Sequence, residues 1–397
     1  MASTGIKDKV AIVGMGCTRF AEHWDKGVPE LLDEAVGQAW ASSGTDRDVV
    51  DAYWLGTMGS GFSGITLAEP LALSGKPVTR VENFCATGSE AFRNACYAVA
   101  SGAYDVVMAV GVEKLKDSGF SGLAIPSPDG DGTEPELSGP AMFSLLAPAY
   151  RAKHGLSAER MKDVLTRIAW KNHHNGARNP LAQYRKEIPE AKIAASPAVA
   201  GQLGVLDCSG VSDGAAAAVL VRAEDAYRYT DRPLFVKALS LVAGNGSGLR
   251  DPGYDFTTLP EAAESAADAY RQAGVTEPRA ELALAEVHDC FTPTELVLME
   301  DLGFAERGKA WRDVLDGVFD LDGDLPVNTD GGLKSFGHPI GASGLRMLFE
   351  CWLQLRGEAP PERRIPGGRT LALTHNLGGQ PGRCVSFVSI VGTEQER

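Results

Sequence analysis

The stretch of sequence that decides the interpretation of this chain is residues 81–90, Val-Glu-Asn-Phe-Cys-Ala-Thr-Gly-Ser-Glu. It follows the extended run 77–81, and apolar residues then recur at helical spacing as far as Val99, before Gly102. Cys85 is therefore expected just before a helix N-terminus, where free N–H groups and the helix dipole lower the pKa of a thiol. A nucleophilic cysteine needs that setting. The alternative is a buried cysteine that acts only as a small hydrophobic residue.

Length, composition and charge limit the class of protein. The chain has 397 residues, enough for two or three units, and its 44% hydrophobic and 23% charged residues are typical of a globular protein. No stretch approaches the ~18 apolar residues of a membrane span, and no signal peptide precedes the first predicted strand. Seven cysteines without metal-like spacing indicate a reduced, cytoplasmic protein. The net charge of -14 argues against nucleic acid or an anionic membrane as partner.

Strand-like and helix-like segments alternate along most of the chain, which indicates an α/β fold. The predicted strands are residues 10–14, 51–56, 105–112, 234–241, 282–288 and 370–375. The predicted helices are residues 29–43, 147–154, 158–174, 261–274, 293–302 and 344–355. Between these two alternating parts, residues 113–222 are typical of an insertion. The order loop, helix, glycine, strand at 85–112 recurs at 337–374, so we predict an internal duplication whose equivalent helix starts face one another.

A second motif is Gly-Gly-Leu-Lys-Ser-Phe-Gly-His-Pro-Ile-Gly-Ala-Ser-Gly, residues 331–344. His338 lies between a glycine and a proline, directly before the helix expected over Ile340–Leu355. Its imidazole is a candidate general base or a donor to a developing oxyanion. The alternative is a histidine whose hydrogen bonds are satisfied within a glycine-rich turn.

Polar residues lie at the ends of two further predicted strands. In Glu-Val-His-Asp-Cys-Phe, His288 and Cys290 face the same side if the chain is extended there. They are candidates for an acid/base couple, for half of a zinc site, or for a buried structural pair. In Leu-Thr-His-Asn-Leu-Gly-Gly-Gln-Pro-Gly, residues 373–382, the strand is expected to end at His375-Asn376. The glycines that follow, with Gly378 first, then offer backbone N–H donors or form a plain turn.

Three other motifs carry less weight. Residues 59–64 satisfy Gly-x-Gly-x-x-Gly and precede a possible helix over 65–73, but the chain's first strand begins at Val10, so a flexible loop is the preferred interpretation. The stretch 127–136, which contains Asp129-Gly-Asp-Gly, lacks the ligands of a calcium loop and indicates a turn. The polar segment 170–178 either approaches the phosphates of a ligand or forms a solvated helix end.

Together these loops identify a resemblance to the thiolase superfamily over essentially the full length. Cys85-Ala-Thr-Gly-Ser is similar to its nucleophile loop and Gly337-His-Pro-Ile-Gly-Ala to its histidine loop. His288-Asp-Cys-Phe and His375-Asn-Leu-Gly stand where common thiolases carry other motifs, and resemble the sterol carrier protein-type branch with its bacterial and archaeal members, which are acetyl-CoA acetyltransferase-like. The resemblance implies two duplicated βαβαβ-type halves in a layered α/β/α/β/α arrangement with an inserted loop domain. The expected divisions are residues 1–114, 115–222 and 223–397.

The resemblance also implies the chemistry. His338 would help to ionise Cys85, whose thiolate would attack a 3-ketoacyl-CoA or an acyl-CoA. Cys290 would act as a neutral acid or as a base at the α-carbon. His338 and His288 would form one oxyanion site, and the N–H groups of Cys85 and Gly378 another. The pKa values of the two thiols would differ because only Cys85 precedes a helix. No metal or permanent cofactor is expected, since coenzyme A and acyl-CoA are substrates.

Further expectations concern partners and alternatives. The resemblance implies a homodimer or homotetramer working in lipid metabolism, and some bacterial and archaeal relatives act with a small OB-fold acyl-CoA-binding protein. No sterol-carrier domain and no Ser-Lys-Leu signal follow the thiolase region, so a peroxisomal enzyme is not implied. The alternatives are a thiolase-like aldolase or acyltransferase, and a non-catalytic acyl-CoA-binding subunit.

Overall fold

The computed structural model describes residues 5–117, 138–246, 248 and 250–395. The turn predicted at 127–136 and parts of both chain ends lie outside these ranges. None of the helices in the described ranges combines the length and apolar character needed to cross a bilayer.

In the described part of the chain, nine strands form one mixed sheet in the order β3-β2-β4-β7-β1-β8-β11-β10-β9. Their bounds are β1 (Val10–Cys17), β2 (Ala52–Gly56), β3 (Val78–Val81), β4 (Val106–Glu113), β7 (Gly214–Arg222), β8 (Leu234–Ala243), β9 (Leu282–Glu286), β10 (Leu371–Gln380) and β11 (Arg383–Gly392). A separate pair comprises β5 (Ala198–Ala200) and β6 (Leu203–Gly204). Strands β1 and β4 are buried along their whole length, which explains their nearly continuous apolar sequences.

The sheet consists of two halves with the same topology. Before Arg222 the order from the centre outward is β1-β7-β4-β2, and after Leu234 it is β8-β11-β10-β9. In each half the first two pairings are antiparallel and the last is parallel. The halves join only through two residue pairs between β1 and β8. The predicted duplication is therefore present, with an additional edge strand, β3, in the first half.

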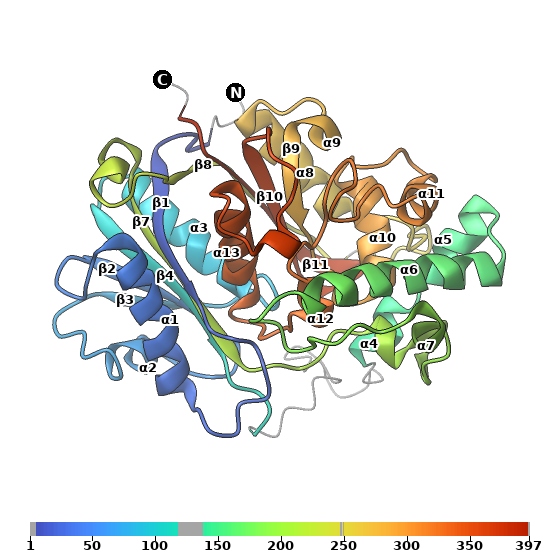
Figure 1. Ribbon diagram of the computed structural model, residues 1–397, viewed down its shortest axis with the longest axis horizontal. Helices are drawn as coiled ribbons and strands as arrows, with labels where there is room; N and C mark the ends of the chain where they lie inside the picture. The colour runs from blue at the N-terminus through green and yellow to red at the C-terminus, as the bar shows by residue number, and fades with distance from the viewer. Residues whose placement is uncertain (1–4, 118–137, 247, 249, 396–397) are drawn as a thin grey trace.

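Helices cover both faces of each half. The α-helices are α1 (Val28–Ser43), α2 (Ile65–Ala68), α3 (Thr87–Ala100), α4 (Gly139–Phe143), α5 (Leu146–His154), α6 (Ala158–Ala177), α7 (Glu190–Ala194), α8 (Pro260–Ala273), α9 (Pro278–Glu281), α10 (Thr292–Asp301), α11 (Ala310–Leu315), α12 (Gly332–Ser335) and α13 (Ser343–Leu355). Helix α1 packs on one outer face and α8 on the other, while α3 and α13 lie side by side between the halves (Figure 1). These contacts give the expected α/β/α/β/α layers.

The starts of α3 and α13 touch through glycines. A Cβ atom at Gly88 would lie 2.7 Å from the carbonyl oxygen of Gly341, and one at Gly344 would lie 2.5 Å from the backbone nitrogen of Ser89. Any side chain would therefore separate the helices. The close approach brings the two segments that precede these helices, with Cys85 and His338, to the same place.

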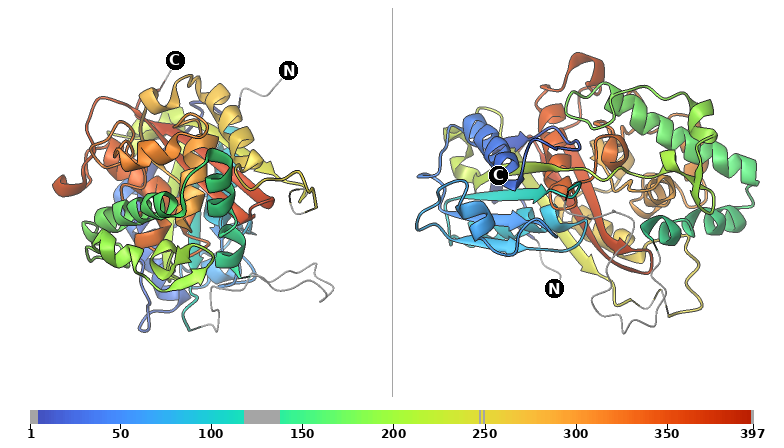
Figure 2. Two further views of the ribbon diagram at one scale, coloured as in Figure 1. Left: turned by 90° about the vertical axis from the view of Figure 1, so that its right-hand side faces the viewer. Right: turned by 90° about the horizontal axis from the view of Figure 1, so that it is seen from below.

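The inserted segment between β4 and β7 supplies α4 to α7 and lies on the opposite side of the molecule from α1 and β2 (Figure 2). Its longest helix, α6, ends with polar residues that are buried rather than solvated, since Lys171, Asn172 and His173 are each less than 5% exposed. The prediction of a solvated helix end at 170–178 is thus wrong for these positions. Burial follows because this face of α6 packs on α10 and α12.

Several predicted boundaries differ from the observed ones. The strand expected over 282–288 ends at Glu286, and the helix expected from Ile340 begins at Ser343. The helix expected over 65–73 is only the single turn α2. The loop 59–64 is held rather than free, because the backbone N–H groups of Gly59 and Ser60 donate to the buried carboxylate of Glu113.

Candidate active site

Four loops from the two halves of the sheet meet at one cavity of about 590 Å³. Cys85, His288, Cys290 and His338 all line it. The Sγ of Cys85 and one ligand nitrogen from each of His288 and His338 lie within 4.8 Å of one another. Residues that are far apart in the sequence are thus brought within the reach of a single substrate carbon.

Cys85 lies on a strained turn between β3 and α3. Phe84, directly before it, has a φ of 50°, a left-handed conformation that a bulky residue rarely adopts. The turn is fixed by two backbone hydrogen bonds, Ala86 N to Asn83 O and Thr87 N to Phe84 O. Asn83 N also donates to the hydroxyl of Thr87 at 2.8 Å. The turn therefore presents the thiol at the cavity in a fixed position.

The electrostatic prediction for Cys85 is wrong. Burial raises the pKa of its thiol to about 12, and the negative charges of Glu82 and Glu113 contribute to the rise. Removal from water favours the neutral thiol more than the helix N-terminus favours the thiolate. Cys85 is therefore a thiol when the site is empty, and it needs a base.

His338 is held as the tautomer that provides such a base. The Ser343 hydroxyl donates to the Pro339 carbonyl at 2.9 Å and lies 2.7 Å from Nδ1 of His338. Since the hydroxyl has already used its hydrogen, Nδ1 must donate to it, and Nε2 carries the lone pair. Nε2 is buried without a hydrogen-bond partner among the described residues. Burial, with a contribution from Arg346, lowers the pKa of His338 to about 3, so the ring is neutral.

The loop between β9 and α10 carries the second cysteine. Cys290 lies two residues before α10, in the same relation to its helix as Cys85 has to α3, so the prediction that only Cys85 precedes a helix is wrong. Burial raises the pKa of Cys290 well above its usual value, and the neighbouring Cys85 adds to this rise. The rings of His288 and His338 meet edge to face with centroids 5.6 Å apart. Burial, reinforced by His338, holds the pKa of His288 well below its usual value.

The fourth segment is a strand and not a glycine-rich loop. Strand β10 continues through Gln380, and Gly378 is paired with Val385 of β11. The hairpin with β11 supplies backbone partners that the sequence pattern did not reveal. A Cβ atom at Gly378 would lie 2.3 Å from the carbonyl oxygen of Asn83, so this glycine packs against the Cys85 turn, while Gly379 lines the cavity. Whether the Gly378 N–H serves an oxyanion stays a prediction.

The same strand is tied to the start of α3. The Asn376 carboxamide oxygen accepts a hydrogen bond of 2.6 Å from Ser89 at the start of α3. His375 is fully buried beside it and its Nε2 lies 3.0 Å from the Ser386 hydroxyl, so it serves packing within the sheet.

Glu113 is a buried carboxylate that links three of the loops. It accepts hydrogen bonds from Thr57 Oγ1 at 3.0 Å, from Met58 N at 3.0 Å and from Gly341 N at 2.9 Å, besides those of Gly59 and Ser60. The end of β4, the loop after β2 and the His338 loop are thereby held in one arrangement.

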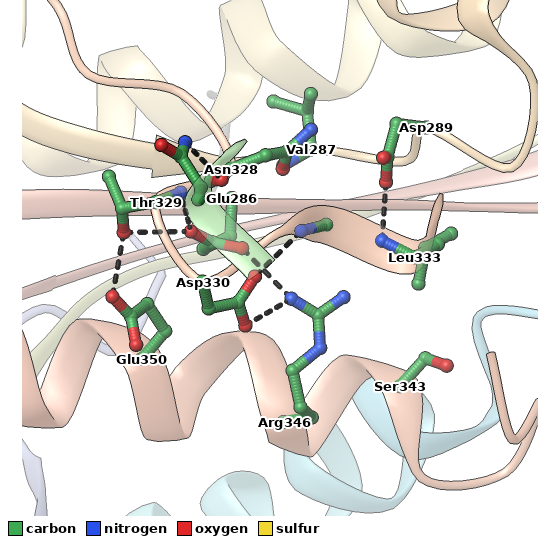
Figure 3. Close-up of polar contacts among 12 residues, drawn as sticks. Glu286, Val287, Asp289, Asn328, Thr329, Asp330, Leu333, Ser343, Arg346 and Glu350 are labelled. Atoms are coloured by element: carbon green, nitrogen blue, oxygen red, sulfur yellow. Dashed lines mark hydrogen bonds and ion pairs between the residues drawn. The ribbon is translucent and has the colours of Figure 1, made fainter. Parts of the chain in front are cut away.

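An ionic cluster holds the end of β9, two residues before His288 (Figure 3). The fully buried guanidinium of Arg346 on α13 donates to Glu286 at 2.9 Å and to Asp330 at 2.5 Å. Thr329 bridges Glu286 and Glu350 at 3.1 and 2.7 Å. Burial, with the charge of Asp330, holds the pKa of Glu286 well above its usual value. Loss of one partner from such a cluster typically costs about 3–5 kcal/mol.

Comparisons with known proteins agree with this geometry. Residues 10–224 match the family described as thiolase, N-terminal domain, and residues 253–390 match the family described as thiolase C-terminal domain-like. This chain belongs to the thiolase family. It is accordingly an enzyme of the acyltransferase class, and its fold is the thiolase fold.

Three proteins illustrate what this thiolase is similar to. An acetyl-CoA acetyltransferase of Methanothermobacter thermautotrophicus is 36% identical over 94% of the chain and 97% of the relative. Sterol carrier protein 2 of Gallus gallus is 33% identical over 93% of the chain and 70% of the relative. A solved structure described as an Ltp2-ChsH2(DUF35) aldolase has a TM-score of 0.83 and 25% identity, covering 99% of this chain and 100% of that one.

Sequence reasoning missed several residues that hold the site of this thiolase. Ser343 sets the tautomer of His338, Glu113 links the loops, and Asn376 joins β10 to α3. Ser343 was the easiest of these to find from the sequence, since it follows His338 within the same motif and begins the next helix. Glu113 gave no signal, because its partners lie in two segments far from it in the sequence, residues 57–60 and Gly341.

Proposed function

We propose that this thiolase cleaves 3-ketoacyl-CoA with coenzyme A, and catalyses the reverse Claisen condensation, through an acyl group carried on Cys85. The observation that carries the proposal is the pairing of a neutral thiol with an unpartnered imidazole nitrogen in one cavity, beside a second buried cysteine. The names of the relatives support coenzyme A thioesters as the substrate class.

In the first half-reaction His338 takes the proton of Cys85 on Nε2 as sulfur attacks the 3-keto carbon. It suits this step that Cys85 and His338 start neutral. The charges then form only when the substrate is bound and its oxygen carries the negative charge. Two oxyanions form along the reaction, first the alkoxide at C3 and then the enolate oxygen of the departing acetyl-CoA. The N–H groups of Cys85 and Gly378 would stabilise one of them, and His288 with protonated His338 would stabilise the other.

In the next step of the same half-reaction the bond between C2 and C3 breaks, and the electron pair moves onto C2 of the departing acetyl-CoA. Cys290 gives its proton to that carbon and becomes a thiolate. Free coenzyme A then returns a proton to Cys290 as its own sulfur attacks the acyl group on Cys85. The bond between the acyl carbon and the Cys85 sulfur breaks, and Cys85 takes its proton back from His338. The raised pKa of Cys290 supports its role as a neutral acid.

A basic groove supports coenzyme A as the second substrate. This groove has four cations, Arg178, Arg185, Lys186 and Lys192, against two carboxylates, Glu187 and Glu362, of which Glu187 pairs with Arg178. It adjoins the catalytic cavity through the shared wall residues Tyr184 and Ile188. The chain as a whole is strongly acidic, so a local group of cations is needed to attract the phosphate groups of coenzyme A.

The proposal extends to assembly and surroundings. Exposed Phe62 and Ile65, beside the edge strand β3, support self-association as a dimer or tetramer. An OB-fold acyl-CoA-binding partner stays part of the proposal, supported by the likeness to the Ltp2-ChsH2(DUF35) aldolase. All seven cysteines are free thiols, which supports a reducing, cytoplasmic compartment. The chemistry needs no metal, although Cys85, His288 and His338 are ligands that zinc prefers.

The test is a set of 3-ketoacyl-CoA substrates assayed with coenzyme A, with mass spectrometry of the Cys85 peptide. The wild type should gain the acyl mass on Cys85, and Cys85→Ala should lose both the acyl mass and turnover. Cys290→Ala should still be acylated by a saturated acyl-CoA, which requires no carbon–carbon cleavage, but should fail to cleave 3-ketoacyl-CoA or to form the carbon–carbon bond in the condensation. Retro-aldol cleavage without an acyl-enzyme, or acyl-CoA binding without turnover, would contradict the proposal.

A further inference from the structure

Three side chains that meet at the catalytic cavity are also a set of metal ligands. The Sγ of Cys85 and one ring nitrogen from each of His288 and His338 lie at most 4.8 Å apart, so all three atoms lie within about 2.8 Å of a common centre. Zinc binds thiolate sulfur at about 2.3 Å and imidazole nitrogen at about 2.0–2.1 Å. Shifts of less than about 1 Å would therefore bring all three atoms to bonding distance of one zinc ion.

His338 already has the arrangement of a metal ligand. Its Nδ1 donates to the Ser343 hydroxyl at 2.7 Å, and its Nε2 is buried without a hydrogen-bond partner among the described residues. A histidine that binds a metal through one nitrogen almost always donates through the other, because this outer hydrogen bond fixes the ring and its tautomer. His338 therefore needs no change of tautomer to bind a metal ion through Nε2.

His288 presents a second imidazole at a suitable distance. It is 1% exposed, and its Nδ1 is buried with no hydrogen-bond partner in the part of the chain that the structure describes. The centroids of the His288 and His338 rings are 5.6 Å apart. Two imidazoles bound to one zinc at the tetrahedral angle have their centroids about 5 Å apart. The two rings thus stand close to the spacing that a shared zinc ion requires.

The charges around the three ligands favour a cation. The negative charges of Glu82 and Glu113 act on the Cys85 thiol, and a field that disfavours a thiolate favours a metal ion at the same place. The buried guanidinium of Arg346 is offset by its ion pairs with two carboxylates. One thiol and two imidazoles are ligands that zinc prefers, whereas magnesium and calcium take oxygen ligands.

We propose that Cys85, His288 and His338 form a zinc site, and that zinc bound there reversibly inhibits the enzyme. The site itself goes beyond the proposed function, since it needs only the three ligands. The inhibition rests on the proposed function, because zinc would occupy the nucleophile and its base together. An open fourth position toward the cavity is left for water.

Binding exchanges a proton for the metal ion. The S–H bond of Cys85 breaks, the sulfur keeps the electron pair and binds zinc, and the proton passes to solvent. His338 cannot keep this proton, because the lone pair of its Nε2 is then bound to the metal. Each zinc ion bound should therefore release one proton.

Two other cysteines of the cavity are not members of this group. Cys290, which the sequence paired with His288 as half of a zinc site, and Cys208 both line the cavity but lie outside the three ligands within 4.8 Å. The third ligand comes instead from the His338 loop. Cys208, which has no part in the proposed catalytic steps, provides a matched control.

The first test measures zinc binding by equilibrium dialysis and cobalt binding by absorption spectroscopy. We expect one tightly bound zinc ion per chain, one proton released, and a thiolate-to-cobalt charge-transfer band. Cys85→Ser should abolish the band and weaken zinc binding by about 100-fold or more, and His288→Asn should weaken binding while keeping the thiol. Ser343→Ala should weaken binding by about 10- to 100-fold, the usual effect of losing the outer hydrogen bond of a ligand.

Cys208→Ala is the control and should keep both the band and the affinity for zinc. The zinc site is overturned if wild type shows no thiolate band with cobalt. It is also overturned if Cys208→Ala weakens zinc binding as much as Cys85→Ser does, because a different set of thiols would then hold the metal.

The second test follows acylation of Cys85 by a saturated acyl-CoA, with mass spectrometry of the Cys85 peptide. We expect zinc to stop acylation and a chelator to restore it. Acylation that continues in the zinc-loaded protein would overturn the inhibition. A protein that binds zinc through Cys85 but is not acylated even without zinc would instead overturn the proposed function, and the inhibition with it, but not the zinc site.

Discussion

The hydroxyl of Ser343 offers a direct test of how His338, the proposed catalytic base, is prepared. Ser343→Ala removes the acceptor that the described residues offer to the His338 Nδ1 hydrogen, at 2.7 Å, and leaves that N–H unsatisfied in a buried site. Such a loss costs about 1–3 kcal/mol. The ring can relieve it only by moving its hydrogen to Nε2 or by turning, and either change removes the lone pair that faces the cavity.

This cost of about 1–3 kcal/mol lowers the population of the His338 tautomer that has its hydrogen on Nδ1 and its lone pair on Nε2. We expect kcat to fall about 5- to 150-fold, with little change in KM because Ser343 does not line the cavity. The assay is single-turnover acylation of Cys85 followed by mass spectrometry, with steady-state thiolysis in parallel. Acylation should slow by the same factor as kcat.

Ser43→Ala is the matched control for this prediction. Ser43 is also a buried helical serine that donates to the carbonyl four residues earlier, Ala39, at 2.9 Å, and it contacts a second polar atom, Thr45 Oγ1, at 2.7 Å. It lies on α1, outside the cavity, so its loss should lower the free energy of unfolding but not the acylation rate. The reasoning about the tautomer fails if Ser343→Ala acylates within twofold of wild type, or if both variants lose activity equally.

Two further predictions concern pH. Because burial raises the pKa of Cys85 to about 12, alkylation of this thiol by iodoacetamide should keep accelerating from pH 7 to pH 9, and a plateau near pH 7 would indicate a preformed thiolate–imidazolium pair. His375 is buried away from the cavity with its pKa lowered to about 3, so the unfolded chain binds its proton first and the protein loses stability as pH falls below about 6.5. His375→Gln should therefore reduce the difference in unfolding free energy between pH 8 and pH 5 by about 2 kcal/mol, and an unchanged difference in denaturant titrations would contradict the assignment.

The local elements were predictable because their signals are local. The apolar runs that became β1 and β4 and the amphipathic stretch that became α1 lie close to their expected bounds. The recurrence of helix, glycine and strand also indicated the duplication, since each half repeats the same chain order. The observed ends of elements differ from the predicted ends where a neighbour in the folded structure sets them. Strand β10, for example, continues through its glycines because β11 pairs with it.

The electrostatics of the site could not be predicted in this way. A cysteine before a helix suggests a thiolate, but the pKa of a thiol depends first on how much water reaches it. That depends on the cavity built by the inserted segment and by both halves of the sheet. The polar end of α6 was misassigned for the same reason, because only the packed structure shows that Lys171 and His173 are covered.

The sequence by itself therefore determined the α/β class and the two repeated halves and pointed to the candidate reactive side chains, since these follow from periodicity and from short motifs. Only the tertiary structure decided that Cys85 is a neutral thiol, and that Ser343 places the lone pair of His338 toward it. The physical reason is that burial and hydrogen-bond direction belong to residues that meet in space, and the chain separates those residues by up to hundreds of positions.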